Sequence, residues 1–121
     1  MKVAVVSDDF ETLSGKVGKA RRFLMYEADR TSQPTLEKKM ELPEHIPTFH
    51  DLHEDDDTLH PLDGTLLITA EAGEGFRERM QRRAITVVIT SERDPEQAVK
   101  LMLDGTLPEL PPTPHREGVC C

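Results

Sequence analysis

The chain has 121 residues, of which 36% are hydrophobic and 31% are charged, a balance typical of one compact domain with a modest core. Its 15 Lys and Arg residues against 23 Asp and Glu residues give a formal net charge of −8, which argues against a nucleic-acid partner. The N-terminal apolar run is far shorter than the about 20 residues of a membrane span, so we expect a cytoplasmic protein without a membrane partner.

Three runs in the N-terminal half predict three strands. The first, at residues 2–7, is apolar and β-branched and ends at two aspartates, which is typical of a buried strand followed by a turn. The runs at 22–28 and 35–42 are joined by a polar spacer that contains a proline. We therefore expect these two runs to form a hairpin whose outer strand is half solvated.

The central segment, residues 43–63, carries many charges and shows little hydrophobic periodicity. This pattern predicts a loop with a weak helix. The apolar residues that could anchor such a helix are Ile46, Phe49, Leu52 and Leu59.

Regular patterns return in the C-terminal half. The apolar runs at 65–69 and 85–90 predict two strands. Between them, Phe76, Met80 and Ala84 fall at helical spacing, which predicts a helix with one apolar face. A strand, a helix and a strand in this order predict a parallel pair with a crossover helix.

A second helix is predicted by its end signals. Asp94 and Pro95 are a favoured N-cap and first helical residue, and Gly105 is a favoured stop. Four prolines follow Leu107, so we expect residues 107–121 to form a flexible tail beyond a single domain of residues 1–106. Together the elements predict an α/β fold, a mixed sheet of about five strands with helices on both faces.

The segment LSGKVGKARR, residues 13–22, has the two glycines and the GK pair of a phosphate-binding loop. If Gly18 and Lys19 were that pair, Leu13 would stand at the required first glycine and Ala20 at the required Ser or Thr. The run that follows has a strand pattern, so no helix N-terminus would point at a phosphate. The nucleotide-binding interpretation therefore fails.

The order of these motifs resembles that of the nitrogenase iron–molybdenum cofactor biosynthesis family. The segments that carry the resemblance are residues 3–9, 14–20, 23–27, 66–75 and 84–88. The resemblance implies a three-layer ribonuclease-H-like fold. It also implies a non-enzymatic, nitrogen-fixation-related protein that binds an iron–molybdenum or molybdenum–sulfur cluster, or an anionic molybdenum species, and passes it to cofactor-synthesis or acceptor proteins.

The chain departs from this family at two places. Lys16 and Val17 stand where many relatives have a His-Phe pair, and Ala70 and Glu71 stand where they have two glycines. The glycine loop therefore lacks the imidazole that could bind a metal there.

An anionic cluster could be held by positive charge and by exposed backbone N–H groups. Four cations surround the glycine loop, and the turn at 72–75 precedes a predicted helix whose N–H groups could face an anion, although Glu71 and Glu74 weaken this second half. The candidate cofactor-binding residues are Ser14, Gly15, Lys16, Gly18, Lys19, Arg21, Arg22, Gly73 and Gly75. The alternative is a solvated turn in which the glycines only permit positive φ.

Histidines and cysteines are candidates for a divalent-metal buffer or sensor. The candidate ligands are His45, His50, His53, His60, Cys120 and Cys121. His50 and His53 are three residues apart among carboxylates, so both could face one metal on a helical turn. The adjacent cysteines cannot join distant parts of the chain, but their thiolates would suit a soft metal. The alternative is a polar surface loop and a thiol pair without a role.

A ribonuclease-H-type hydrolase is the third hypothesis, with Asp8, Asp9 and Asp63 as its carboxylates. Such an enzyme needs acids that converge on one point and a surface that attracts nucleic acid. Asp8 and Asp9 instead end a strand, and the net charge is unfavourable, so the sequence meets neither requirement.

Overall fold

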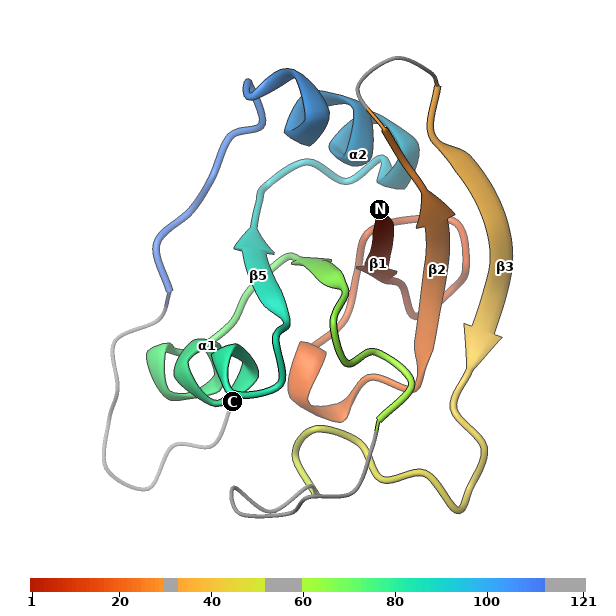
Figure 1. Ribbon diagram of the computed structural model, residues 1–121, viewed down its shortest axis with the longest axis vertical. Coiled ribbons are helices and arrows are strands. Elements are labelled where there is room, and N and C mark those ends of the chain that lie inside the picture. Colours follow the sequence, from red (N-terminus) through yellow and green to blue (C-terminus); the bar gives the residue numbers. More distant parts are fainter. Residues whose placement is uncertain (30–32, 52–59, 113–121) are drawn as a thin grey trace.

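The computed structural model describes residues 1–29, 33–51 and 60–112 (Figure 1). Within these residues the chain forms a five-stranded sheet, with two α-helices and one 3-10 turn. The strands are β1 (Lys2–Val6), β2 (Arg22–Glu27), β3 (Thr35–Glu41), β4 (Leu66–Thr69) and β5 (Thr86–Ile89). The helices are η1 (Val17–Lys19), α1 (Glu74–Gln81) and α2 (Pro95–Asp104).

The sheet is mixed and has the order β3-β2-β1-β4-β5. The predicted hairpin is confirmed, because β2 and β3 pair antiparallel from Arg22 with Glu41 to Glu27 with Thr35. The predicted parallel pair is also confirmed in β4 and β5, and β1 pairs parallel with β4. The segments that follow β1, β4 and β5 therefore leave the sheet at the same edge, which we call the carboxyl edge.

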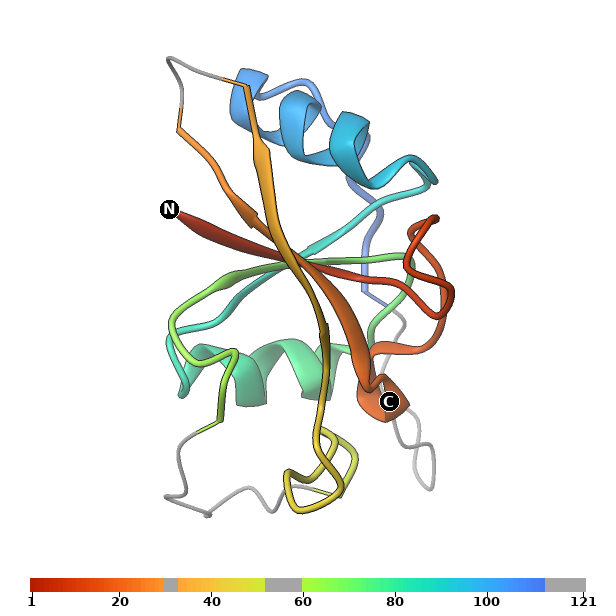
Figure 2. The ribbon, with the colours of Figure 1, turned by 90° about the vertical axis from the view of Figure 1, so that its right-hand side faces the viewer.

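Alternate side chains of the strands enter two cores on opposite faces of the sheet, as the period of two in a strand requires. Ala4 and Val6 of β1 pack on the face covered by α1, while Val3 and Val5 pack on the face covered by α2 (Figure 2). A helix on each face agrees with the prediction. The three-layer ribonuclease-H-like arrangement is more specific than this and stays a prediction.

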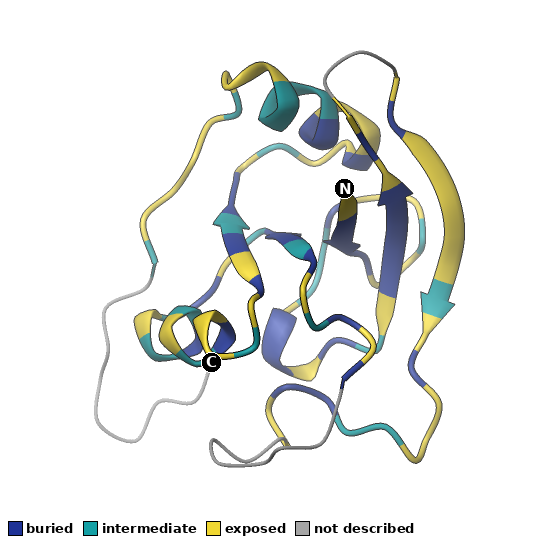
Figure 3. Ribbon diagram, in the orientation of Figure 1, coloured by how far each residue is buried: buried dark blue, intermediate teal, exposed yellow. Residues whose placement is uncertain are grey.

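The outer strand β3 is more exposed than the predicted half-solvated strand. All of its residues except Met40 are exposed, whereas the four central residues of β2 are buried (Figure 3). β3 is exposed because it is an outermost strand of the sheet and neither helix covers it (Figure 2).

The second helix begins and ends as predicted. Asp94 Oδ1 accepts a hydrogen bond from the Gln97 N–H at 3.2 Å, Pro95 is the first helical residue, and Gly105 ends the helix with φ of 73°. The first helix is shorter than predicted, because it ends at Gln81. Ala84 lies beyond it with φ of 58° and is exposed, so its placement on the buried face was wrong.

Residues 43–51 form turns, so the predicted weak helix is not found in this part of the segment. Phe49 is nevertheless buried and Ile46 packs against the core, as expected of anchors. Leu52 and Leu59 lie outside the described residues.

The start of the expected tail is attached to the sheet. The Leu110 N–H donates to the Ile89 carbonyl at 2.7 Å, and Glu109 forms an antiparallel bridge with Thr90. The Glu109 carboxylate also lies 3.5 Å from Nη2 of Arg77 on α1. The domain boundary at residue 106 stays a prediction, and residues 113–121 lie outside the described part of the chain.

Candidate functional site at the carboxyl edge

The glycine loop, residues 13–20, lies at the carboxyl edge beside the start of α1 (Figure 2). The Ser14 N–H donates to the Val6 carbonyl at the end of β1, at 3.1 Å. The Leu13 N–H donates to the Arg93 carbonyl in the segment after β5, at 2.8 Å. Val17 shares a buried cluster with Phe76 of α1. Backbone bonds and packing thus hold the loop against three segments of this edge.

Gly15 is required by the shape of the loop. Its φ is 91°, and a Cβ atom on it would lie 2.4 Å from Asp8 Oδ1 and 2.7 Å from Asp8 Oδ2. Gly18 differs, because it is buried within η1 and its φ is not positive. The conformational freedom of glycine therefore matters at the first of the two glycines and not at the second.

The polar side chains before Gly15 bind the loop itself. Asp9 Oδ1 accepts the N–H groups of Thr12 at 2.8 Å and Glu11 at 2.9 Å, and these bonds hold the pKa of Asp9 well below its usual range. Ser14 Oγ accepts the Asp8 N–H at 3.1 Å and donates to the Thr12 carbonyl at 3.2 Å. The Ser14 hydroxyl, a predicted cluster contact, is thus used within the loop.

The two arginines among the predicted cations also have structural partners. Arg21 Nη1 donates to the carbonyls of Pro43 at 3.2 Å and Ile46 at 3.1 Å. Arg22 Nε lies 2.8 Å from Glu41 Oε1 on β3. The arginines therefore attach the loop to the neighbouring segments.

The two lysines differ from the arginines. Lys16 and Lys19 are exposed, and their ammonium groups have no hydrogen bond or ion pair to any residue in 1–29, 33–51 or 60–112. The Lys19 N–H donates to the Lys16 carbonyl at 3.2 Å, which closes a tight turn between the two residues. The positive charge that the loop can offer to a ligand is therefore that of the lysine pair.

The start of α1 contributes backbone donors to the same edge. Gly73 is its N-cap and has no side chain that could accept a hydrogen bond from the first helical N–H groups. Glu71 and Glu74 are exposed on either side of it. These negatively charged carboxylates repel an anion at the helix start. The glycine loop is therefore a more favourable place for an anion than the start of α1.

Residues 45–50, which include two of the candidate histidines, touch the glycine loop, a contact that the sequence does not predict. The His50 N–H donates to the Gly18 carbonyl at 2.7 Å, and the His50 side chain is exposed. The signal available in the sequence was Phe49, an aromatic residue in a polar segment, which is 1% exposed and packs in the core of the α1 face. His45 is exposed as well.

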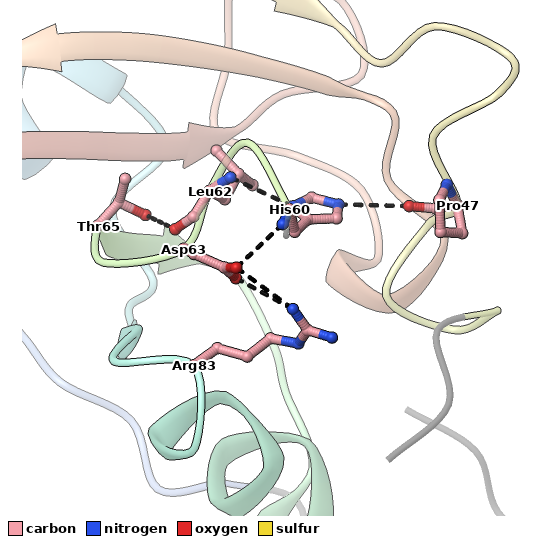
Figure 4. A network of polar contacts seen from close by, with 6 residues as sticks. All are labelled: Pro47, His60, Leu62, Asp63, Thr65 and Arg83. Carbon is pink, nitrogen blue, oxygen red and sulfur yellow. Dashed lines mark hydrogen bonds and ion pairs between the residues drawn. The ribbon is translucent and has the colours of Figure 1, made fainter. Parts of the chain in front are cut away.

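His60 is buried in a network of polar contacts (Figure 4). Its Nδ1 accepts the Leu62 N–H at 3.2 Å, so Nε2 carries the proton and donates to the Pro47 carbonyl at 3.3 Å. The His60 N–H donates to Asp63 Oδ2 at 2.9 Å, and Asp63 Oδ1 lies 3.3 Å from Arg83 Nη1. Since both ring nitrogens are occupied, a metal bond to His60 would have to break one of these contacts.

This network predicts a loss of stability in weak acid. Burial lowers the pKa of His60 below its ordinary value of ~6.5, because the charged form is desolvated beside Phe49. The folded state then binds this proton less readily than the unfolded chain, so the stabilisation is full above pH ~6.5 and falls as the pH decreases through the folded pKa. Urea unfolding from pH ~7.5 to ~5 should show this decrease.

Two variants test the assignment of this pH dependence. His60→Gln should remove most of it, because glutamine does not titrate. His45→Gln, at an exposed histidine, should keep it. An unchanged pH dependence in His60→Gln would contradict the assignment.

In residues 1–29, 33–51 and 60–112, no group of three or more His, Cys, Asp or Glu side chains is arranged to hold a metal ion. His53, Cys120 and Cys121 lie outside the described residues. The carboxylates of the hydrolase hypothesis are not brought together, because Asp8 and Asp9 follow β1 whereas Asp63 precedes the parallel strand β4, at the opposite edge of the sheet.

No helix in residues 1–29, 33–51 or 60–112 is long and apolar enough to cross a bilayer.

A sequence model of the family described as "Dinitrogenase iron-molybdenum cofactor" matches residues 1–105. No curated protein matches the chain.

Two solved structures are similar to this fold. The crystal structure of PH0822 has a TM-score of 0.62 and 20% sequence identity, over 90% of this chain and 94% of that one. The NMR structure of a NifB-like protein from Thermotoga (TM1290), of the DUF35 family, has a TM-score of 0.57 and 23% identity, over 97% of this chain and 98% of that one. At 20% and 23% identity, the similarity shows the fold alone.

Proposed function

Since the chain belongs to the dinitrogenase iron-molybdenum cofactor family, we propose that it is a non-enzymatic carrier of an anionic metal–sulfur species. In this proposal it binds an iron–molybdenum or molybdenum–sulfur cluster, or an anionic molybdenum species, in the cytoplasm. It then passes this ligand to cofactor-synthesis or acceptor proteins. The same proposal includes the finer fold assignment, a three-layer ribonuclease-H-like arrangement.

The observation that carries the proposal is the lysine pair on a fixed glycine loop. Lys16 and Lys19 are exposed on a loop that backbone bonds hold at the carboxyl edge. Ammonium groups and free N–H groups at a helix start attract an anion by charge and by hydrogen bonding, without a metal–protein bond. Ligands commonly bind at the carboxyl edge of open α/β sheets, which agrees with this placement.

The other two functions have less support from the described residues. A divalent-metal buffer would need converging histidines, whereas His60 is buried in its own network and His50 lies against the glycine loop. A ribonuclease-H-type hydrolase would need Asp63 beside Asp8, and these residues lie at opposite edges of the sheet.

The experiment is an anaerobic titration with tetrathiomolybdate, a coloured divalent thioanion, at low and high salt. Lys16→Ala combined with Lys19→Ala should weaken binding by about tenfold for each lysine, and most strongly at low salt. Lys38→Ala combined with Lys39→Ala is the matched control, because it removes the same charge from the exposed strand β3. Equal losses in both double variants would indicate a general charge effect and overturn the proposal.

A further inference from the structure

The two aspartates that follow β1 differ in what their side chains contact. The Asp9 carboxylate accepts hydrogen bonds from the N–H groups of Glu11 and Thr12 and from the Thr12 hydroxyl. The Asp8 carboxylate is exposed and has no hydrogen bond or ion pair to any residue in 1–29, 33–51 or 60–112. Asp9 therefore stabilises the turn after β1, whereas the carboxylate of Asp8 is available to a ligand.

The main chain of Asp8 is nevertheless fixed beside the glycine loop. Its N–H donates to Ser14 Oγ at 3.1 Å, and its carbonyl accepts a hydrogen bond from Arg22 Nη1 at 2.9 Å. The carboxylate lies against Gly15, because a Cβ atom added to that glycine would be 2.7 Å from Asp8 Oδ2. A carboxylate on a short, anchored side chain thus occupies the space that Gly15 leaves open, next to Lys16.

This carboxylate is unfavourable for an anion that presents sulfur or oxygen atoms alone, because its negative charge repels them. An anion that contains a metal atom with an exchangeable ligand is different. A carboxylate oxygen can bind the metal atom while the ammonium groups of Lys16 and Lys19 attract the rest of the anion. The protonated lysines have no lone pair for a metal, whereas carboxylates are established ligands of iron in proteins.

We propose that the Asp8 carboxylate binds an iron atom of the cluster held at the glycine loop, and that it thereby selects clusters with an exchangeable ligand on iron. This inference rests on the proposed carrier function. The bond forms by ligand exchange: a carboxylate oxygen donates a lone pair to iron, and a ligand such as chloride leaves with the electron pair of the broken bond. No atom changes oxidation state, and one anionic ligand replaces another.

The test compares two probes of equal charge under anaerobic conditions. Tetrathiomolybdate has no exchangeable ligand on iron, whereas its adduct with the neutral salt iron(II) chloride carries chlorides there. Asp8→Asn should weaken binding of the iron adduct by at least about tenfold, since the loss of even a supporting contact costs a metal site that much. The same variant should bind tetrathiomolybdate as tightly as the unmodified protein or more tightly, because a repulsive charge is gone.

The matched control is Glu11→Gln, which removes an exposed carboxylate from the same turn after β1. It should keep the tight binding of the iron adduct. Urea unfolding curves of both variants should match that of the unmodified protein, because neither carboxylate has a partner in the described part of the chain.

The outcomes separate the two proposals. Unchanged binding of the iron adduct by Asp8→Asn, or an equal loss in Glu11→Gln, overturns the role of Asp8 and leaves the lysine loop intact. Weaker binding of both probes by Asp8→Asn also overturns that role, because it indicates a damaged loop rather than a lost metal bond. Failure of the unmodified protein to bind either probe overturns the carrier function and this inference together.

Discussion

Replacing Phe49 by alanine will lower the free energy of unfolding by about 3–5 kcal/mol, the usual cost of a large-to-small change at a buried aromatic residue. The ring is 1% exposed and contacts both His60 and Phe76. Its loss leaves a cavity between the central segment and α1.

The control is Phe10→Ala, the same chemical change at a half-buried ring. Phe10 has the Arg22 guanidinium 5.5 Å above it and packs at the margin of the other core. We expect a clearly smaller loss of stability, because less of the Phe10 ring is buried. Urea unfolding curves at pH ~7.5 measure both variants, and similar losses would show that Phe49 does not hold the segment in place.

Replacing Gly15 by valine will disrupt the loop and abolish binding of tetrathiomolybdate. A β-branched residue at φ of 91° is strained by about 1–3 kcal/mol. Its Cβ would also lie 2.4 Å from Asp8 Oδ1 and would displace that carboxylate. Asp8 is exposed, so its carboxylate can swing aside at little cost in stability. The displacement instead changes the surface that faces a ligand.

Gly64→Val is the matched control for this prediction. Gly64 has a φ of 80°, but nothing lies within 4 Å of the added Cβ, and it precedes β4 at the edge opposite the glycine loop. It should lose a similar amount of stability through backbone strain and bind tetrathiomolybdate normally. Loss of binding in both variants would attribute the effect to general destabilisation rather than to the loop.

Much of the fold was predictable because it depends on local patterns. The buried run of β1 and the hairpin of β2 and β3 follow from hydrophobic patterning and turn residues, and Asp94 and Gly105 mark the ends of α2. The early end of α1 was not predictable from periodicity. There the chain turns through a left-handed alanine, Ala84, and no glycine or proline marks the position.

The site was predicted less completely, because its contacts join residues far apart in the sequence. Charge alone could not distinguish the arginines from the lysines, since Arg21 is engaged by carbonyls of the central segment. The bond between His50 and Gly18 likewise depends on how Phe49 packs in the core. Hydrophobic periodicity carries no information on either contact.

We propose that an anionic metal–sulfur species binds at the glycine loop and the start of α1. The most direct measurement is a series of amide NMR spectra of the ¹⁵N-labelled protein during titration with tetrathiomolybdate. We predict that the amide signals of residues 15–20 and 74–76 move first and furthest, and that high salt reduces these shifts. Shifts confined to other regions, such as β3 or the segment after α2, with the signals of residues 15–20 unchanged, would contradict the account.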